Sequence, residues 1–464
     1  MSTPMTPSHA PLPMPGLAGL VAQLPGARVV GTLPENILRV HTDTRSLQAG
    51  DLFVALRGER FDAHDFCDQA VAAGASALLV ERELPLAIPQ LVVGDTLKGL
   101  GRLGRLVRER INPKVLAITG SCGKTTVKEM ATAILRCEGE VLATAGNFNN
   151  EVGVPLTLLR LEPQHQFAVM ELGANHPGEI AWTTSLARPD AAIINNVAAA
   201  HLEGFGSLEG VFHAKSEIFE GLGEGGTAIV NADNEFWPKW REKGIHCAFS
   251  LEDQRQPFHA RDIVLNEQGC AGFVMVTPQG EMNLTLAIPG RHNVANALAA
   301  AAGTLALGAS LASVKAGLEQ MAPVKGRFCV QRWGGLTLVD DTYNASVESV
   351  LAGIDALTAM NGYKVLVFGD MKELGEESAA QHARVGHHAR EQGLDAVLTV
   401  GEQSRHTADA AAGRHFDNKS SLFEVLAQMI KTHQEISILV KGARGSRMED
   451  IVEMVKGHQE SATC

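Results

Sequence analysis

One short stretch, Thr119–Thr126, has residue types and spacing that suit the phosphates of a nucleotide. It reads T-G-S-C-G-K-T-T and follows a short apolar run. Gly120 and Gly123 allow a tight turn whose N–H groups point inward, toward an anion. Lys124 can reach the terminal phosphates, and the hydroxyl of Thr125 can ligate Mg²⁺. We therefore predict that ATP is bound by Thr119, Gly120, Ser121, Cys122, Gly123, Lys124, Thr125 and Thr126.

The stretch departs from the usual phosphate-loop motif, G-x-x-x-x-G-K-[ST]. The position five residues before Gly123 is Ile118, so the first glycine is displaced to Gly120. A tight strand-to-helix turn that binds no ligand would use the same glycines. The tetrapeptide G-K-T-T between a predicted strand and a predicted helix favours the phosphate loop.

The composition of the chain limits the classes of function. Its 464 residues correspond to about three domains. The formal net charge of −12 gives no support for nucleic-acid binding. Seven scattered cysteines, with no C-x-x-C pair, argue against a disulfide framework and a structural zinc site. The first 16 residues lack the pattern of a secretory signal, and no apolar run is long enough to span a bilayer, so we predict a cytoplasmic protein without membrane insertion.

Short apolar runs alternate with helical patterns along most of the chain, which predicts α/β domains with mostly parallel sheets. After a flexible tail at 1–16, we predict a small α/β substrate domain at 17–113. A central ATPase domain of the P-loop type, with a parallel sheet, is predicted at 114–324. A Rossmann-like, doubly wound domain is predicted at 325–464. Residues 255–288 alternate apolar and polar residues between glycines, and we expect antiparallel hairpins there.

The displaced glycine resembles the pattern of the Mur ligase superfamily, whose members add amino acids to the peptidoglycan precursor. The segment H-T-D-T-R-S-L-Q-A-G-D-L-F-V-A-L-R-G from His41 resembles the UDP-sugar-binding region of the later ligases. Four further motifs resemble the ligase that adds D-alanyl-D-alanine: G-N-F-N-N-E-V-G-V-P-L-T-L-L from Gly146, M-E-L-G-A-N-H-P-G-E-I from Met170, D-D-T-Y-N-A-S from Asp340 and G-D-M-K-E-L-G from Gly369. The D-N-P-R motif of the third-step ligase is absent.

This resemblance implies a reaction in two steps. ATP phosphorylates the C-terminal carboxylate of UDP-N-acetylmuramoyl-tripeptide, and the amine of D-alanyl-D-alanine then attacks the acyl phosphate and expels phosphate. The identity of the third residue of the tripeptide stays open. We expect a monomer that uses ATP and two Mg²⁺ ions.

The resemblance also assigns the metal sites. Glu171 ends a predicted strand, where its carboxylate would share one Mg²⁺ with Thr125. His201 and Lys215 match the residues that serve a second Mg²⁺, and Lys215 is open to carbamylation by CO₂. A surface acid at Glu171 and an ordinary hydrogen-bonded histidine at His201 are the alternatives. The implied catalytic set is Lys124, Asn150, Glu171, His201 and Lys215.

The remaining candidates hold substrates. Asn293 and Asn296 match an adenine-side motif, although Asn293 can also be read as a helix cap. Arg327 is expected to reach the phosphates and Asp341 the ribose, although an arginine in a linker can be a solvated charge. The candidates for the uridine diphosphate are Thr44, Arg45 and Ser46, and those for the acceptor are Asn344, Asp370, Lys372, Lys441 and Arg444. Asp62 and His64 lie in a further matched segment and receive no role.

Two other functions share parts of this pattern. Another ligase of the superfamily, such as the diaminopimelate- or lysine-adding enzyme or folylpolyglutamate synthase, would have the same ATP site. The absent D-N-P-R motif and the segment from His41 to Gly58 argue against these. A nucleotide switch without ligase activity would need a phosphate loop but not Glu171, His201 and Lys215 together.

Overall fold

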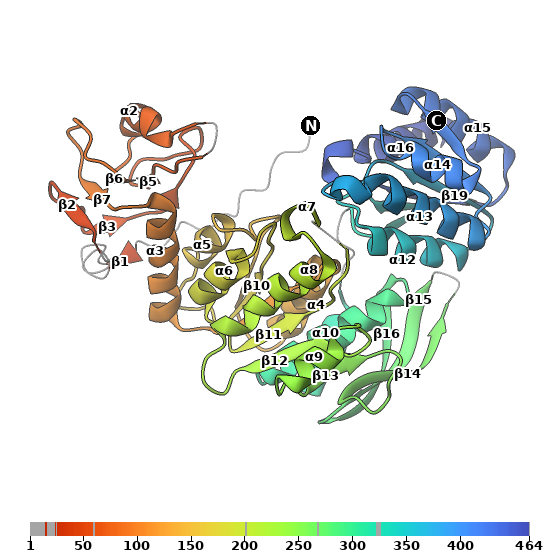
Figure 1. The fold of residues 1–464 in the computed structure, drawn as a ribbon, viewed down its shortest axis with the longest axis horizontal. Helices are drawn as coiled ribbons and strands as arrows, with labels where there is room; N and C mark the ends of the chain where they lie inside the picture. Colours follow the sequence, from red (N-terminus) through yellow and green to blue (C-terminus); the bar gives the residue numbers. More distant parts are fainter. Residues whose placement is uncertain are drawn as a thin grey trace.

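The computed structural model describes residues 14–15, 24, 26–58, 61–199, 202–266, 269–321 and 326–463. Three α/β domains lie in a row, with the central domain between the other two (Figure 1). Their sheets have five, nine and six strands, which confirms the prediction of a three-domain α/β chain. Within the described ranges, no helix is both long and apolar enough to cross a membrane.

The N-terminal domain is built on a five-stranded sheet with the order β2-β7-β6-β5-β4. Neighbouring strands are parallel except for the pair β2 and β7. Its elements are β2 (Arg28–Val30), β4 (Val40–His41), β5 (Leu52–Val54), η1 (Ala63–Phe66), α2 (Cys67–Ala72), β6 (Ala77–Val80), β7 (Gln90–Val92) and α3 (Thr96–Ile111). Most of the predicted tail at 1–16 lies outside the described residues. Met14 and Pro15 form β1 and pair with β3 (Asn36–Ile37), so the tail prediction is wrong for these two residues.

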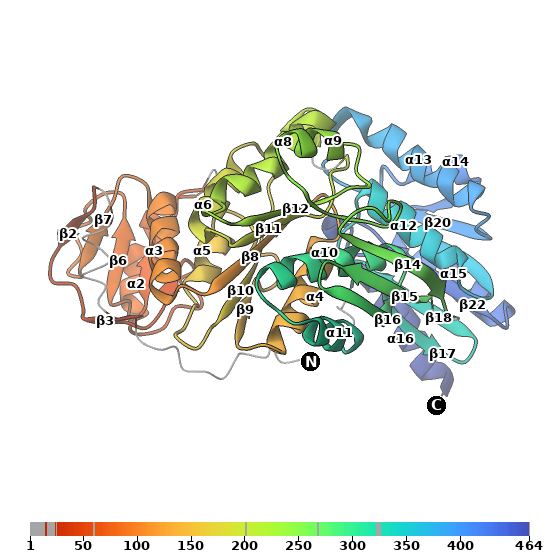
Figure 2. The same ribbon diagram turned by 90° about the horizontal axis from the view of Figure 1, so that it is seen from below.

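Helix α3 joins the N-terminal domain to the central domain. Asp95 caps its start by accepting the N–H of Lys98 at 2.8 Å, and Asn112 ends it in the left-handed conformation. Gly104 lies directly against α5 (Gly153–Leu158) of the central domain, because a Cβ added there would be 3.0 Å from both the Cα and the carbonyl oxygen of Pro155. Figure 2 shows α3 between the first sheet and α5. This close approach fixes the N-terminal domain on the central domain.

We expect Gly104→Val to lower the thermal midpoint of unfolding, because the added side chain meets backbone that cannot rotate away. Overpacking of this kind typically costs about 1–3 kcal/mol. The matched control is Gly457→Val in α16 (Glu449–Thr463), where an added Cβ meets nothing within 4 Å. Calorimetry of both variants checks the prediction. An equal midpoint for the two variants would contradict the proposed close packing of α3.

The central sheet has the order β16-β15-β14-β13-β12-β11-β8-β10-β9. Its strands are β8 (Lys114–Thr119), β9 (Val141–Ala143), β10 (Phe167–Glu171), β11 (Ala191–Ile194), β12 (Thr227–Asn231), β13 (Cys247–Ser250), β14 (Phe258–Leu265), β15 (Cys270–Thr277) and β16 (Gly280–Pro289). In this order, every neighbouring pair from β14 through β8 to β9 is parallel. The pairs β14–β15 and β15–β16 are antiparallel. The hairpins expected at 255–288 are therefore confirmed for these last two pairs.

Helices cover both faces of the central sheet and bury two apolar cores. They are α4 (Lys124–Arg136), α5, α6 (Glu179–Ala187), α7 (Leu202–Phe205), α8 (Leu208–Ser216), α9 (Trp237–Glu242), α10 (His292–Ala306) and α11 (Leu311–Glu319). Strand β8 is buried along almost its whole length, as expected for a parallel strand covered on both faces. Because β8 lies between β10 and β11, the carboxyl ends of these three strands meet at one edge of the sheet.

The C-terminal domain has a six-stranded sheet with the order β17-β18-β22-β19-β20-β21. Its strands are β17 (Cys329–Trp333), β18 (Leu336–Asp341), β19 (Tyr363–Phe368), β20 (Ala396–Val400), β21 (Arg414–Phe416) and β22 (Ile436–Lys441). Its helices are α12 (Val347–Thr358), α13 (Ser378–Glu391), α14 (Arg405–Ala411), α15 (Lys419–Thr432) and α16. Helices α12 and α13 pack on one apolar core and α15 and α16 on another, as predicted for a doubly wound domain.

The C-terminal domain touches the central domain near the carboxyl edge of the central sheet. A Cβ added to Gly375, in the loop after β19, would lie 3.9 Å from the Cα and Cβ of Glu203 in α7. The predicted boundary at 324–325 falls outside the described residues. The predicted boundary at 113–114 falls between the end of α3 at Ile111 and the start of β8 at Lys114.

Candidate active site

The phosphate loop has the strand–loop–helix context that its sequence indicates. It leaves β8 at Thr119 and enters the 13-residue helix α4 at Lys124. Gly123 is the N-cap of α4 and has a φ of 77°, a conformation that favours glycine. The free N–H groups and dipole at the start of α4 suit an anion. The Nζ of Lys124 lies 2.6 Å from the carbonyl oxygen of Gly120, to which it donates a hydrogen bond.

The predicted metal pair comes together next to this loop. The hydroxyl of Thr125 donates to a carboxylate oxygen of Glu171 at 2.8 Å. Glu171 ends β10 and is 3% exposed, so its carboxylate is held in the crevice and is not a surface acid. Its other carboxylate oxygen accepts a hydrogen bond from the amide of Asn149 at 2.9 Å.

Asn149 is a site residue that sequence reasoning misses, because the prediction singles out its neighbour, Asn150. The side-chain oxygen of Asn150 accepts the backbone N–H of Gly153 at 2.9 Å, at the start of α5. Asn150 is exposed and organises this turn, whereas Asn149 points at Glu171. The predicted catalytic role of Asn150 stays a prediction.

Oxygen ligands from Thr125 and Glu171 fit Mg²⁺, which prefers a carboxylate, hydroxyl, water and phosphate oxygens. In the part of the chain that the structure describes, no group of three or more His, Cys, Asp or Glu side chains is arranged to hold a metal ion. The remaining Mg²⁺ ligands would then be water and the phosphates of ATP.

Charged groups from two domains act on Lys124. Burial lowers the pKa of Lys124, and the carboxylate of Glu171 acts in the opposite direction. The guanidinium of Arg327 lowers this pKa further, and the carboxylate of Glu373 raises it. Because Arg327 and Glu373 belong to the C-terminal part of the chain, the phosphate loop faces that domain.

Lys215 lies inside the central domain and not on its surface. It sits in α8 and is 1% exposed, and its Nζ makes no hydrogen bond or ion pair to another residue that the structure describes. Burial, followed by the charge of Lys124, holds the pKa of Lys215 well below its ordinary value. This environment disfavours the charged form of the amine. His201, its predicted partner at a second metal ion, lies outside the described residues.

Two predicted residues of the C-terminal domain, Arg327 and Arg444, lie near the ring of Tyr343. The guanidinium of Arg327 stacks on the ring of Tyr343 at 4.1 Å, and that of Arg444 lies 6.0 Å from the same ring. Arg327 is therefore ordered by an aromatic contact and is not a solvated linker charge. Tyr343 is a second residue that sequence reasoning misses.

Lys441 is placed differently from its prediction as a ligand for a substrate carboxylate. Its Nζ donates to Asp341 at 2.5 Å and to the carbonyl oxygen of Asn344 at 3.1 Å. Only 2% of Lys441 is exposed. This geometry favours a role in which Lys441 positions Asp341, whose other oxygen accepts the N–H of Phe328 at 3.2 Å.

Asp370 is also engaged inside the protein. Its carboxylate accepts the backbone N–H groups of Glu402, Gln403 and Ser404 at 3.1, 3.0 and 2.8 Å. It is 6% exposed and holds the loop before α14, and its predicted contact with the acceptor stays a prediction. Its neighbour Lys372 is exposed on the same loop as Glu373 and stays available for a substrate.

The predicted uridine diphosphate residues lie apart from this cluster, at the carboxyl edge of the N-terminal sheet. Thr44, Arg45 and Ser46 lie in the loop after β4, which ends at His41. Arg45 is exposed and its guanidinium pairs with Asp43 at 2.6 Å, while the Ser46 hydroxyl lies 3.1 Å from His41 Nε2. Figure 1 places this domain on the opposite side of the central domain from the acceptor candidates.

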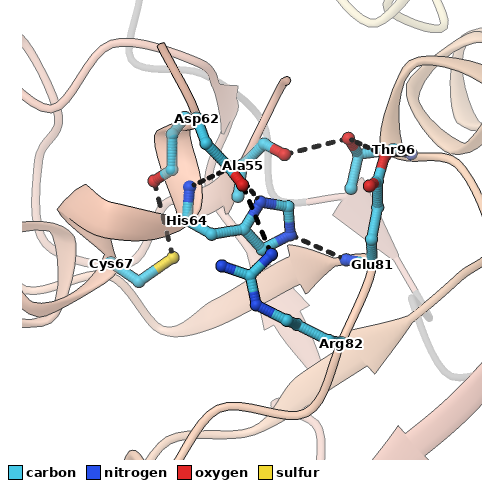
Figure 3. Close-up of polar contacts among 8 residues, drawn as sticks. Ala55, Asp62, His64, Cys67, Glu81, Arg82 and Thr96 are labelled. Carbon is cyan, nitrogen blue, oxygen red and sulfur yellow. Dashed lines mark hydrogen bonds and ion pairs between the residues drawn. The ribbon is translucent and has the colours of Figure 1, made fainter.

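Asp62 and His64, in a segment that resembles the family, make contacts that hold the N-terminal domain together (Figure 3). His64 is 4% exposed, and its Nε2 accepts the backbone N–H of Glu81 at 2.8 Å. Its Nδ1 therefore carries the hydrogen and donates it to Asp62 at 2.5 Å. The other carboxylate oxygen of Asp62 accepts from Arg82 at 3.3 Å. These contacts fasten η1 to the segment that follows β6.

The predicted adenine residues, Asn293 and Asn296, are buried in the first turns of α10, with 3% and 6% exposure. The amide of Asn293 donates to the carbonyl oxygen of Pro289 at 2.6 Å, and that of Asn296 donates to the side-chain oxygen of Asn293 at 2.9 Å. Arg291 is the N-cap of α10, so the reading of Asn293 as the cap is wrong.

Comparison with known proteins agrees with this geometry. The Mur ligase middle domain matches residues 118–304, the Mur ligase glutamate ligase domain matches 326–444, and the Mur ligase family catalytic domain matches 36–101. The UDP-N-acetylmuramoyl-tripeptide–D-alanyl-D-alanine ligase of Escherichia coli is 52% identical over 430 residues, which cover 92% of this chain and 94% of that protein.

Solved structures give the same result. A crystal structure of MurF from Acinetobacter baumannii is 39% identical, with a TM-score of 0.91, and the match covers 96% of this chain and 99% of that one. A MurF ligase from Thermotoga maritima, solved in complex with ADP, is 30% identical, with a TM-score of 0.82 and coverage of 91% and 98%. The chain belongs to the Mur ligase family and, within it, to the UDP-N-acetylmuramoyl-tripeptide–D-alanyl-D-alanine ligases.

Proposed function

We propose that this chain uses ATP to join D-alanyl-D-alanine to the C-terminal carboxylate of UDP-N-acetylmuramoyl-tripeptide, for peptidoglycan precursor synthesis. The observation that carries the proposal is the Thr125–Glu171 pair beside the phosphate loop, in a chain 52% identical to a ligase of that name. The complex of the Thermotoga maritima relative with ADP supports ATP as the phosphate donor.

Each domain binds a different ligand in this proposal. We assign the uridine diphosphate part of the substrate to residues 17–113, ATP to 114–324 and D-alanyl-D-alanine to 325–464. Arg327, Asp341 and the exposed Lys372 and Arg444 are the C-terminal residues placed for substrates. The contact of Gly375 with Glu203 and the effect of Arg327 on the pKa of Lys124 support a C-terminal domain that faces the phosphate loop. Closure of this domain over ATP would exclude water from the acyl phosphate.

At the reacting end of ATP, Lys124 and the N–H groups of the loop bind the phosphates. Thr125 and Glu171 would hold Mg²⁺, which supplies charge neutralisation between the phosphate and the attacking carboxylate. Asn149 orients the carboxylate of Glu171 by donating to the oxygen that Thr125 does not contact. The phosphates of ATP and the substrate carboxylate are both anionic and repel each other, so Lys124 and Mg²⁺ would lower the barrier to their approach.

We further propose a second Mg²⁺ held by His201 and by a carbamate on Lys215. A carbamate forms when the neutral amine attacks CO₂ and loses a proton, which converts a cation into an oxygen ligand. The burial of Lys215 supports this assignment, because burying a lysine amine costs free energy when no partner compensates the lost contact with water.

A cytoplasmic location is proposed because both ATP and the UDP-linked substrate would be used there. Free thiols are consistent with that reducing compartment, and the described cysteines are all free: Cys67, Cys122, Cys137, Cys247, Cys270 and Cys329. The monomeric state stays a prediction that sedimentation of the purified protein checks.

The test of the proposed function is the substrate dependence of ADP release. We expect ADP only when ATP, UDP-N-acetylmuramoyl-tripeptide and D-alanyl-D-alanine are all present, with a UDP-linked pentapeptide as the product. Mass spectrometry identifies that product. ADP release with a single amino acid and none with the dipeptide would indicate another ligase of the family. ATP hydrolysis without either other substrate would indicate a nucleotide switch.

A further inference from the structure

A buried histidine of α13 holds the loop that follows β19. His382 is 0% exposed, and its Nε2 accepts the backbone N–H of Met371 at 3.0 Å. Its Nδ1 donates to the carbonyl oxygen of Ser378, one turn earlier in α13, at 2.8 Å. Since a carbonyl oxygen only accepts, the proton of the neutral ring lies on Nδ1 and Nε2 is the free acceptor. Burial lowers the pKa of His382 and so favours this neutral form.

Both partners of this hydrogen bond belong to one frame that includes α14. The carboxylate of Asp370, next to Met371, accepts three backbone N–H groups of the loop before α14. Helix α14 is tied back to α13, because the hydroxyl of Thr407 donates to the carbonyl oxygen of His382 at 2.8 Å. A Cβ added to Gly386 of α13 would collide with the carbonyl oxygen of Thr407, so the two helices are in direct contact. The position of Met371 is therefore fixed relative to both helices.

The residues after Met371 form a part of the C-terminal domain that reaches the central domain. Gly375 lies against Glu203 of α7. Glu373 has a φ of 63°, which is uncommon for a residue other than glycine and costs free energy unless its surroundings maintain it. Burial lowers the pKa of Lys124 and the carboxylate of Glu373 opposes this effect, so Glu373 lies within electrostatic reach of the phosphate loop. A loop with this strain needs a firm support at its start.

We propose that His382 is a positioning residue that holds the loop 371–375 in the conformation that meets the central domain. It acts through the backbone of Met371 and not by contact with a substrate. This inference deepens the function proposed above and rests on it for the identity of the substrates. Without the acceptor at Nε2, the N–H of the buried Met371 would lose its partner, and the strained loop would lose its support. The reaction of D-alanyl-D-alanine needs both domains and would slow, whereas ATP binding at the phosphate loop would not change.

The experiment compares His382→Leu with His382→Gln in the intact chain. Leucine fills the buried space but offers no acceptor, whereas the side-chain oxygen of glutamine can accept the N–H of Met371. With MgATP and UDP-N-acetylmuramoyl-tripeptide saturating, we expect kcat/KM for D-alanyl-D-alanine to fall about tenfold in His382→Leu, as loss of a buried partner typically does. In His382→Gln it should stay within about threefold of wild type, and the dissociation constant of MgATP alone should stay within about twofold in both variants.

The matched control is His388→Leu, which removes a second imidazole from the same helix. The Nε2 of His388 lies 2.7 Å from a carboxylate oxygen of Asp355 in α12, so this side chain contacts another helix and not the loop 371–375. This variant should keep the wild-type kcat/KM for D-alanyl-D-alanine. Thermal midpoints of unfolding, recorded for all variants, show whether each one is folded at the assay temperature.

Three results would overturn the inference. The first is a kcat/KM for D-alanyl-D-alanine within about twofold of wild type in His382→Leu. The second is an equal fall in His382→Leu and His382→Gln with unchanged thermal midpoints, since the acceptor would then not be what matters. The third is a His382→Leu variant that is unfolded or binds MgATP weakly, since the residue would then support the fold at large.

Failure of the proposed function gives a different result. A wild-type chain that forms no product with D-alanyl-D-alanine would contradict that function. The same comparison of His382→Leu, His382→Gln and His388→Leu would then be made with the acceptor that the wild type uses, and the same three results would overturn the role of His382.

Discussion

Replacement of Lys124 by alanine is expected to abolish product formation while the protein stays folded. We expect the rate to fall about 10³-fold, as for other groups that stabilise charge during the reaction. The only hydrogen bond of the Lys124 head group within the described residues goes to the carbonyl oxygen of Gly120, so its loss breaks no structural network. Burial already lowers the pKa of Lys124, so its removal also relieves a cost of desolvation.

The measurement is the initial rate of ADP release with all three substrates, together with the thermal midpoint of unfolding. Lys239→Ala is the control, because this lysine of the same domain pairs with Glu209 at the surface at 2.6 Å. The control should keep wild-type turnover. Near-normal turnover of Lys124→Ala would refute the phosphate-loop assignment, and a large fall in its midpoint would contradict the expected intact fold.

The parts of this site that could be predicted from sequence are those fixed by local rules. The phosphate loop depends on glycines and a lysine that are close in sequence, between an apolar strand and a helix. Glu171 can be predicted as a site residue because it ends a strand, and the carboxyl ends of neighbouring parallel strands meet at one edge of the sheet. The alternation of strands and helices was enough for the α/β class.

The residues that could not be predicted depend on the exact course of a turn or on distant contacts. Asn149 and Asn150 have the same side chain, and only the path of the loop decides which one reaches Glu171. Asn195 and Asn196 directly follow β11, which ends at Ile194, and no local pattern indicates that both side chains turn toward Cys122.

Distant pairing places two of the predicted residues against other parts of the protein. Lys441 and Asp341 are 100 positions apart and meet because β18 and β22 are neighbours in the sheet. Asp370 is a candidate for the acceptor because it lies in a matched motif. The three backbone N–H groups that it accepts come from a different strand-to-helix loop, which no local pattern indicates.

Replacement of Lys215 by alanine is expected to lower turnover about 10²-fold, with partial recovery when a short carboxylic acid such as acetate or formate is added. In the native chain, burial and the charge of Lys124 lower the pKa of the amine and so favour its neutral form, which is the form that reacts with CO₂. A small carboxylate that diffuses into the cavity left by the side chain would supply the oxygen ligand that the carbamate normally provides.

Initial rates at increasing acetate concentration, with fixed MgATP and ionic strength, measure this recovery. Lys124→Ala is the control, since an added carboxylate cannot replace a cation at the phosphates and should restore nothing. Wild-type turnover should also fall when dissolved CO₂ and bicarbonate are removed, and return when bicarbonate is restored. Turnover of Lys215→Ala that is independent of every short acid, together with wild-type turnover that is insensitive to CO₂, would exclude the carbamate. Lys215 would then act as a buried amine whose pKa is lowered by burial and by the charge of Lys124.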